Sequence, residues 1–315
     1  MKALYNLKIV GFALLVLLVS CNKEPVIDNE TMLDGNKIKD PSIANPEKYL
    51  VSSAIPAPTA VEKQRPVIIA VHGYSATTYE WDEFRSWSDS VGKYYVSQVL
   101  LGGHGRDYET FKKASWLDWQ KPIIDEYLKL VALGFANISI VGSSTACPLM
   151  LDMVASNKFG NGLMPKHLLM VDPIIVPSSK TLAIVDIVGP VLGYVSTDPD
   201  SSEIGHWYSY RPQESLNQLL DIITTARKEL EDGILLPVGT DLKVYKSIKD
   251  GAADPVGAVL LYKGVRNANE SRITVEMEDS QLHVFTRLKG RNSFTTKDKA
   301  LQIKVFEDIA KILGK

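Results

Sequence analysis

The stretch that most constrains the fold lies near the middle of the chain, at residues 138–148. It reads Ile-Ser-Ile-Val-Gly-Ser-Ser-Thr-Ala-Cys-Pro. Alternating and β-branched apolar residues lead into a turn of small residues, and the apolar residues that follow recur at helical spacing. This pattern predicts a buried strand, a tight turn that carries a serine, and then a helix. A strained backbone at such a turn makes the serine hydroxyl stand clear of the strand end.

Two adjacent serines occupy this turn, and the sizes of their neighbours distinguish them. The residues two before and two after the exposed serine press against each other, so both must be small. Ser144 has Gly142 and Ala146 at these positions, whereas Ser143 would have a β-branched residue on each side. Cys147 is a rival nucleophile by chemistry, but it falls within the first turn of the helix. Ser144 is therefore the candidate nucleophile; the alternative is a buried strand and helix joined by a serine-rich turn.

The amino terminus has the pattern of an export signal. Lys2 and Lys8 precede the apolar run 9–19, which is too short for a relaxed membrane span. The sequence Leu-Val-Ser-Cys that ends at Cys21 resembles the lipobox of bacterial lipoproteins. This resemblance implies cleavage of residues 1–20, a lipid on Cys21, and a lipid-anchored, exported protein of the bacterial cell envelope. The alternatives are an ordinary secretory signal and an uncleaved anchor.

Removal of this leader changes the charge and the cysteine count. The chain has a formal charge of −2, and loss of the leader's two lysines makes it −4, which offers no basic surface for nucleic acid. Cys147 would be the one thiol left, so an intrachain disulfide is not expected. Residues 21–48 are polar and contain proline, which predicts a flexible tether. Residues 49–315 are long enough for one large domain.

Within residues 49–315, strand-like and helix-like segments alternate. This order is typical of an α/β protein with a mostly parallel central sheet flanked by helices. The predicted strands are Tyr49–Ile55, Val67–Val71, Tyr95–Leu101, Ile138–Val141, Lys166–Val171, Leu242–Ser247 and Arg272–Glu276. The predicted helices are Tyr79–Val91, Trp116–Leu133, Thr145–Ala155, Pro212–Glu231, Asp254–Lys263 and Thr296–Leu313.

A second motif ends the apolar strand at residues 67–71 with the sequence His72-Gly73-Tyr74. Glycine lets the backbone turn its N–H groups toward the carboxyl edge of the sheet, where ligands bind in open α/β folds. Taken alone, this motif would be no more than a strand that ends in a glycine turn.

Three motifs together resemble the carboxylesterase and monoacylglycerol-lipase branch of the α/β-hydrolase superfamily. They are Val-His-Gly-Tyr-Ser-Ala-Thr-Thr-Tyr-Glu-Trp at 71–81, Leu-Gly-Gly-His-Gly at 101–105, and Val-Gly-Ser-Ser-Thr-Ala at 141–146. The resemblance implies the α/β-hydrolase fold with a lid insertion after the sixth strand, here at about 174–212. It also implies Ser144 as the nucleophile and the backbone N–H groups of Tyr74 and Thr145 as the oxyanion hole.

A serine hydrolase of this fold needs an acid after the serine. The superfamily has its acid just after the strand predicted at 242–247, in a run that matches Lys-Asp-Gly-Ala-Ala-Asp-Pro at 249–255. The resemblance therefore indicates Asp250. Asp254 precedes a proline and is a good helix N-cap, and it remains an alternative, as does Asp172 at the end of the preceding strand.

The same order requires a histidine still further along the chain, and the sequence has five histidines. His283 alone follows the final predicted strand, where the superfamily has its base; the alternative is a surface histidine. The others lie in glycine turns before the serine, at the start of a buried strand, or in the insertion; they are His72, His104, His167 and His206.

These motifs predict a serine hydrolase that cleaves carboxylic esters, monoacylglycerols and short to medium acyl esters among them. Thioesterase, acyltransferase or peptidase activity would use the same triad, and a catalytically silent binding lipoprotein is the competing class. Neither a metal nor an organic cofactor is expected, because His-rich or Cys-rich ligand spacing is absent from the sequence. The apolar run 182–194 predicts a cap that favours an acyl chain, or a helix that packs on the core. The expected partners are a small acyl ester and, through Cys21, a membrane.

Overall fold

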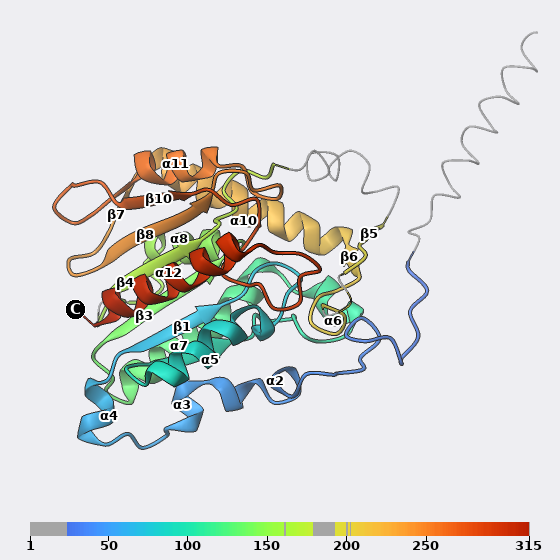
Figure 1. The fold of residues 1–315 in the computed structure, drawn as a ribbon, viewed down its shortest axis with the longest axis horizontal. Coiled ribbons are helices and arrows are strands. Elements are labelled where there is room, and N and C mark those ends of the chain that lie inside the picture. Colours follow the sequence, from blue (N-terminus) through green and yellow to red (C-terminus); the bar gives the residue numbers. More distant parts are fainter. Residues whose placement is uncertain (1–23, 161, 179–192, 200, 202, 315) are drawn as a thin grey trace, which may run out of the picture.

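A six-stranded parallel sheet forms the centre of the molecule (Figure 1). The computed structural model describes residues 24–160, 162–178, 193–199, 201 and 203–314. The order of the strands confirms the predicted α/β class with its mostly parallel sheet. From one edge to the other they are β10 (Thr274–Glu278), β8 (Asp241–Ser247), β4 (His167–Val171), β3 (Ile138–Ser143), β1 (Val67–Val71) and β2 (Tyr95–Val99).

The apolar composition of β1 follows from burial on both faces of the sheet. Val67, Ile69 and Val71 pack into one hydrophobic core, while Ile68 and Ala70 pack into the other. Successive side chains of a strand point to opposite faces, so a continuous apolar run can fill both layers. This burial explains why the central strands could be predicted from apolar runs alone.

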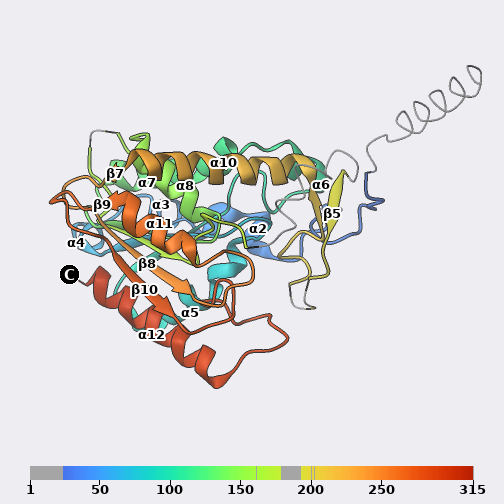
Figure 2. The ribbon, with the colours of Figure 1, turned by 90° about the horizontal axis from the view of Figure 1, so that it is seen from above.

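Helices cover both faces of the sheet (Figure 2). Among the described elements, two helices contribute to the core on one face and four to the core on the other. The first pair is α5 (Asp82–Val91), preceded by the short helix η2 (Thr78–Trp81), and α12 (Thr296–Leu313). The second group is α7 (Trp116–Ala132), α8 (Ala146–Ala155), α10 (Gln213–Asp232) and α11 (Val256–Gly264).

The strand predicted at Tyr49–Ile55 is wrong. These residues form parts of two short helices, η1 (Pro46–Tyr49) and α3 (Val51–Ala54), which pack beside the edge strand β2. The Val51 N–H donates to the Ser97 hydroxyl (3.0 Å) and the Ser52 N–H to the Glu126 carboxylate (3.1 Å). These side chains accept hydrogen bonds from backbone N–H groups that would otherwise have to pair with a neighbouring β-strand. A short alternation of apolar residues does not show that such side-chain acceptors are present.

Part of the segment 21–48, which was predicted to be a flexible tether, packs against the domain from Leu33 onward. Leu33 and Ile43 are fully buried, and Ile43 belongs to the short helix α2 (Pro41–Ala44). The Asp34 carboxylate accepts hydrogen bonds from the N–H groups of Ser209 (2.9 Å) and Tyr210 (3.1 Å). The polar composition of this segment could not reveal the packing, because these hydrogen-bond partners are about 175 residues away in the chain.

The expected leader and its lipid site, residues 1–20 and Cys21, lie outside the described residues, as does most of the apolar run 182–194. Among the described residues, no helix has both the length and the apolar character that a membrane span requires. The described part of the expected lid includes an antiparallel hairpin of β5 (Tyr194–Ser196) and β6 (Tyr210–Pro212). The smaller elements are α4 (Ala60–Gln64), α6 (Tyr108–Lys113), β7 (Ile234–Leu235) and β9 (Val265–Arg266).

Candidate active site

Ser144 lies directly after β3, at the carboxyl edge of the sheet. Its φ angle is 51°, in the left-handed region that L-residues rarely adopt. A side chain on Gly142 would lie 2.8 Å from the Ala146 Cβ and 2.6 Å from the Met150 sulfur, so this position accepts glycine alone without rearrangement. The turn therefore has the geometry that the sequence predicted, with small residues on both sides of a strained serine.

The other two candidate nucleophiles of this stretch are engaged elsewhere. The Ser143 hydroxyl is fully buried and donates to the Glu80 carboxylate. The Cys147 thiol is also fully buried, and it points at the Gly142 carbonyl (3.4 Å). Burial raises the pKa of Cys147 well above its ordinary value, which disfavours the nucleophilic thiolate.

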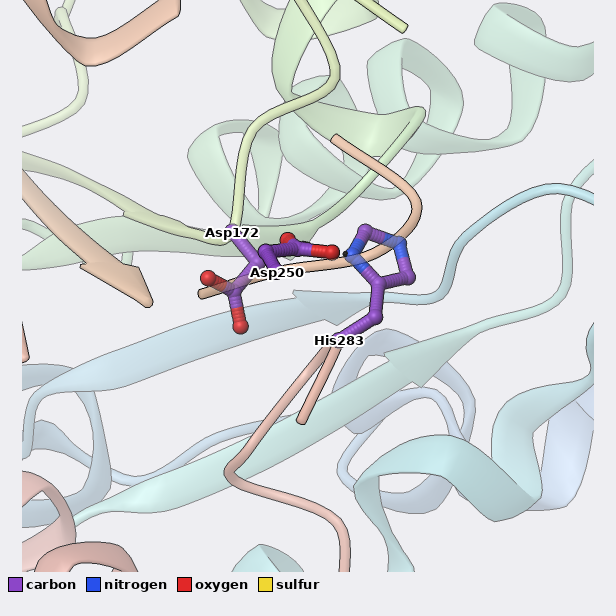
Figure 3. Close-up of side chains that lie close together, drawn as sticks. All are labelled: Asp172, Asp250 and His283. Atoms are coloured by element: carbon purple, nitrogen blue, oxygen red, sulfur yellow. Dashed lines mark hydrogen bonds and ion pairs between the residues drawn. The ribbon is translucent and has the colours of Figure 1, made fainter. Parts of the chain in front are cut away.

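The structure brings Ser144, His283 and Asp250 into one chain of hydrogen bonds. His283 Nε2 is 2.8 Å from Ser144 Oγ, and its Nδ1 is 2.8 Å from Asp250 Oδ2. Figure 3 shows the Asp250 carboxylate directed at the imidazole ring. A carboxylate cannot donate, so Nδ1 carries the proton and Nε2 is free to accept the serine proton.

The Asp250 carboxylate is surrounded by donors. Oδ1 accepts the backbone N–H groups of Ala252 (2.8 Å) and Ala253 (3.1 Å), and Oδ2 accepts from Lys246 in addition to His283. Burial alone would raise the pKa of Asp250, but the His283 hydrogen bond and the charges of His283 and Lys246 lower it to about 2. The carboxylate is therefore ionised at neutral pH.

The two alternative acids have other partners. Asp172 is fully buried, and its carboxylate accepts from the N–H groups of Ser247 (2.7 Å) and Phe285 (3.2 Å). In Figure 3 its carboxylate points away from the imidazole ring, whereas that of Asp250 points toward it. Asp254 accepts the Val256 N–H (2.8 Å), but the N-cap of α11 is Pro255, so the predicted N-cap at Asp254 is wrong by one residue. The hydrogen bond to the histidine thus comes from the predicted Asp250.

Asp172, Asp250 and His283 also lie close enough together to suggest a metal site, with their ligand atoms within 4.8 Å of one another. The Lys246 ammonium contacts both carboxylates, at 3.3 Å from Asp172. A cation placed there would have to displace a buried positive charge that already neutralises the acids. The arrangement suits an orienting network for the histidine better than a metal centre.

The two predicted oxyanion donors are backbone groups beside Ser144. A Cβ on Gly73 would lie 3.0 Å from the Ser144 Cβ, so this loop passes directly over the serine. Neither the Tyr74 nor the Thr145 N–H donates a hydrogen bond within the described part of the chain. Glu80 fixes the loop by accepting the Gly73 N–H (2.8 Å) and the Ser143 hydroxyl.

Glu80 and Lys246 are site residues that the sequence analysis missed. Glu80 stands inside the motif at 71–81, and Lys246 lies near the end of a predicted strand. A glutamate beside Trp81 and a second lysine in the strand predicted at 242–247 were the available signals. Both side chains are almost wholly buried, which the sequence does not state.

The remaining histidines have structural partners. His72 Nδ1 donates to the Gly73 carbonyl (2.8 Å) and its Nε2 accepts the Leu101 N–H (3.0 Å). Burial lowers the pKa of His72 to about 4, so the ring is neutral. His104 packs edge-on against Phe111. The other two pair with acids: His206 with Asp40 (3.2 Å) and His167 with Asp241 (3.8 Å).

The loop that carries His283 is held under strain. Val284 has a φ angle of 53°, an unusual conformation for a β-branched residue. Arg291 donates to the His283 carbonyl and to the Val284 carbonyl (3.2 Å). Ser75 and Asp172 near the same site also have positive φ angles, of 58° and 46°. Such strain persists where surrounding contacts fix the backbone, and it is common at functional sites.

Ser144 opens into a cavity of about 490 Å³. Its walls combine apolar side chains with arginines, and the described part of the expected lid contributes to them. The apolar and aromatic lining is Tyr74, Ile174, Val195, Trp207, Leu216, Leu219 and Val284; the charged lining is Glu80, Arg211, Arg287 and Arg291.

Comparison with known proteins identifies the fold. No protein-family model matches the sequence, and no curated protein matches it. A solved structure from work on the metagenome-derived lipolytic enzymes LipS and LipT is 16% identical, with a TM-score of 0.61 over 80% of this chain and 95% of that one.

Two further solved structures are similar. Monoglyceride lipase from Saccharomyces cerevisiae, in complex with a substrate analogue, has 12% identity and a TM-score of 0.62 over 79% of this chain and 86% of that one. The enol-lactonase from Burkholderia xenovorans has 12% identity and a TM-score of 0.52 over 80% and 92%. With its parallel sheet, its helical layers and these neighbours, the chain has the α/β-hydrolase fold.

Proposed function

We propose that this protein is a serine hydrolase that cleaves carboxylic esters. The observation that carries the proposal is the hydrogen-bonded chain from Asp250 through His283 to Ser144, with both links at 2.8 Å, at a cavity of about 490 Å³. The left-handed backbone of Ser144 supports the assignment, because it presents the hydroxyl to the cavity instead of burying it in the strand.

In the proposed mechanism, His283 Nε2 takes the proton of Ser144 as Oγ attacks the carbonyl carbon. Asp250 keeps the ring in the productive tautomer and stabilises the imidazolium. The N–H groups of Tyr74 and Thr145 bind the oxyanion, and one such donor can contribute about 10²- to 10³-fold in rate. The imidazolium protonates the departing alcohol, and a water activated by the same histidine then releases the acyl group.

The apolar wall of the cavity supports an acyl chain as part of the substrate. Ile174, Leu216 and Leu219 line this wall. We therefore place monoacylglycerols and short to medium acyl esters within the proposed range. The yeast neighbour is a monoglyceride lipase, and the other two neighbours above are lipolytic or lactonase proteins, which is in line with ester chemistry.

A fluorophosphonate probe tests the proposal, because it phosphonylates a serine that has been activated by a triad. We expect the wild type to be labelled and Ser144→Ala to be unlabelled, while Cys147→Ser stays labelled as the matched control. Absence of labelling in a folded, monodisperse wild type would refute the triad and favour a catalytically silent binding protein. Turnover of oxygen esters, thioesters and amides of the same acyl chain would then separate esterase from thioesterase and peptidase activity.

We also propose that the protein is exported and anchored in the bacterial cell envelope by a lipid on Cys21. Support comes from the sequence Leu-Val-Ser-Cys after the apolar run 9–19. Metabolic labelling with an alkynyl fatty acid, followed by fractionation, tests this. We expect label in the wild-type membrane fraction and none in Cys21→Ser; an unlabelled wild type would contradict the anchor.

A further inference from the structure

Three arginines line the cavity beside Ser144. Arg211 reaches it from β6, and Arg287 and Arg291 reach it from the loop after His283. Glu80 is the one carboxylate among the described lining residues, and its oxygen already accepts the Gly73 N–H and the Ser143 hydroxyl. A purely aliphatic ester carries no charge that could pair with these guanidinium groups, so the partners of each arginine within the protein matter.

Two of these arginines have partners within the protein. Arg287 forms an ion pair with Glu203 (2.6 Å) and lies over the Trp207 ring, 4.5 Å from its centroid. Arg291 donates through Nε to the Arg287 carbonyl (2.7 Å) and through its terminal nitrogen to the His283 carbonyl. These contacts fix the loop that follows His283, and they account for Arg287 and Arg291 without a bound ligand.

Arg211 differs from both. Within the described residues its guanidinium makes no hydrogen bond and no ion pair, and it lies 5.9 Å from the centroid of the Tyr74 ring. Its Nε is buried and has no hydrogen-bond partner. The charge of Glu203 favours the protonated form of Arg211, but the Glu203 carboxylate is bound to Arg287. A partly buried guanidinium without a partner is costly, and an anion in the cavity would offset that cost.

We propose that the substrate carries an anionic group, a carboxylate or a phosphate, which Arg211 binds while the ester carbonyl lies at Ser144. The inference rests on the proposed esterase function and narrows it to anionic esters. The apolar wall would hold the aliphatic part of the same molecule, so the substrate class is an ester with a short aliphatic segment and one anionic end. The planar fork of arginine suits carboxylate and phosphate equally, since both present two oxygens to it.

Two matched pairs of esters test the proposal and distinguish the two anions. The first pair is the 4-nitrophenyl monoester of glutaric acid and its neutral methyl ester, which differ in one carboxylate. The second pair is butyrylglycerol phosphate and butyrylglycerol. We expect the anionic member to have the higher kcat/KM in at least one pair. Equal or better hydrolysis of the neutral member in both pairs would overturn the proposal.

The variants assign any such preference to Arg211. Arg211→Gln should reduce the anionic-to-neutral ratio of kcat/KM by roughly 10- to 100-fold, the range for one charge-assisted hydrogen bond. Arg211→Lys should keep part of the preference, and Arg227→Gln, on the exposed side of α10, should keep all of it while removing the same charge. A preference that survives Arg211→Gln unchanged would overturn the assignment.

One measurement on the wild type is independent of whether the variants fold. Glutarate or inorganic phosphate should compete with a neutral ester, and absence of competition by both would count against the anion site. Fluorophosphonate labelling separates the two proposals: a labelled Ser144 without anion preference sinks the anion site alone. A wild type without labelling would remove the esterase function and the anion site together.

Discussion

Replacement of Asp250 by asparagine is the most informative single change in the site. Both carboxylate oxygens accept from donors: Oδ2 from His283 and Lys246, and Oδ1 from two backbone N–H groups. An asparagine must turn its NH₂ toward one of these sets. If the amide NH₂ faces His283, the ring has to move its proton to Nε2, and it then cannot accept the proton of Ser144.

The opposite orientation of the amide restores the histidine contact at a structural cost. The NH₂ would then face the N–H groups of Ala252 and Ala253, leaving buried donors unpaired at about 1–3 kcal/mol each. An NH₂ that faces His283 also faces Lys246, but the Lys246 ammonium keeps the Asp172 carboxylate (3.3 Å) as an acceptor, so we expect the inactive tautomer to dominate. Loss of the orienting acid in a triad lowers kcat about 10⁴-fold, which corresponds to about 5.5 kcal/mol of transition-state stabilisation.

The assay is steady-state hydrolysis of a 4-nitrophenyl ester by wild type, Asp250→Asn and Asp254→Asn, with thermal unfolding measured alongside. Asp254→Asn should keep most activity, because asparagine can still accept the Val256 N–H at the helix start. Asp172→Asn should lower the thermal unfolding temperature, since the Asp172 carboxylate accepts the backbone N–H groups of Ser247 and Phe285. Equal losses for Asp250→Asn and Asp254→Asn would refute the reasoning.

Two further predictions concern stability. Gly142→Ala should lower the free energy of unfolding by about 1–3 kcal/mol in denaturant titrations, because the new Cβ would lie 2.6 Å from the Met150 sulfur. Gly162→Ala is the control, since a Cβ there meets no atom within 4 Å. An unchanged unfolding midpoint for Gly142→Ala would contradict the packing argument. For Asp40, burial would raise the pKa, but the neighbouring His206 ring and the hydrogen bond from Ser42 lower it to about 2 from 3.8. Its contribution to stability is therefore complete above about pH 3.8 and is lost as the pH falls toward 2, so the Tm deficit of Asp40→Asn should shrink over that window; a constant deficit in thermal melts would show that the charge is not involved.

Much of the fold could be predicted because it is encoded locally. Apolar runs such as 67–71 and 138–143 are buried on both faces of the sheet, and α12 begins at a capping box formed by Thr295 and Asp298. Both features need only neighbouring residues, so the sequence reveals them. The conformation of residues 49–55 could not be predicted in this way, because it depends on hydrogen-bond acceptors in the distant residues Ser97 and Glu126.

The sequence by itself determined the turn around Ser144, because the requirement for small residues at 142 and 146 is steric and local. It also determined the order in which an acid and a histidine would follow. The tertiary structure alone decided which of three aspartates contacts His283, since a hydrogen bond depends on distances between segments far apart in the chain.

The same limit explains what the sequence could not reveal. In the sequence, Glu80, Lys246 and Arg211 are ordinary charged residues. In the structure, Glu80 holds the oxyanion loop, Lys246 lies between two carboxylates, and Arg211 lines the cavity without a hydrogen-bond partner among the described residues. Their burial, and the partners that they have or lack, arise when distant strands and loops meet at one edge of the sheet. The folded environment gives these residues their chemistry, because a buried charge there must be paired with a group of the protein or with a ligand.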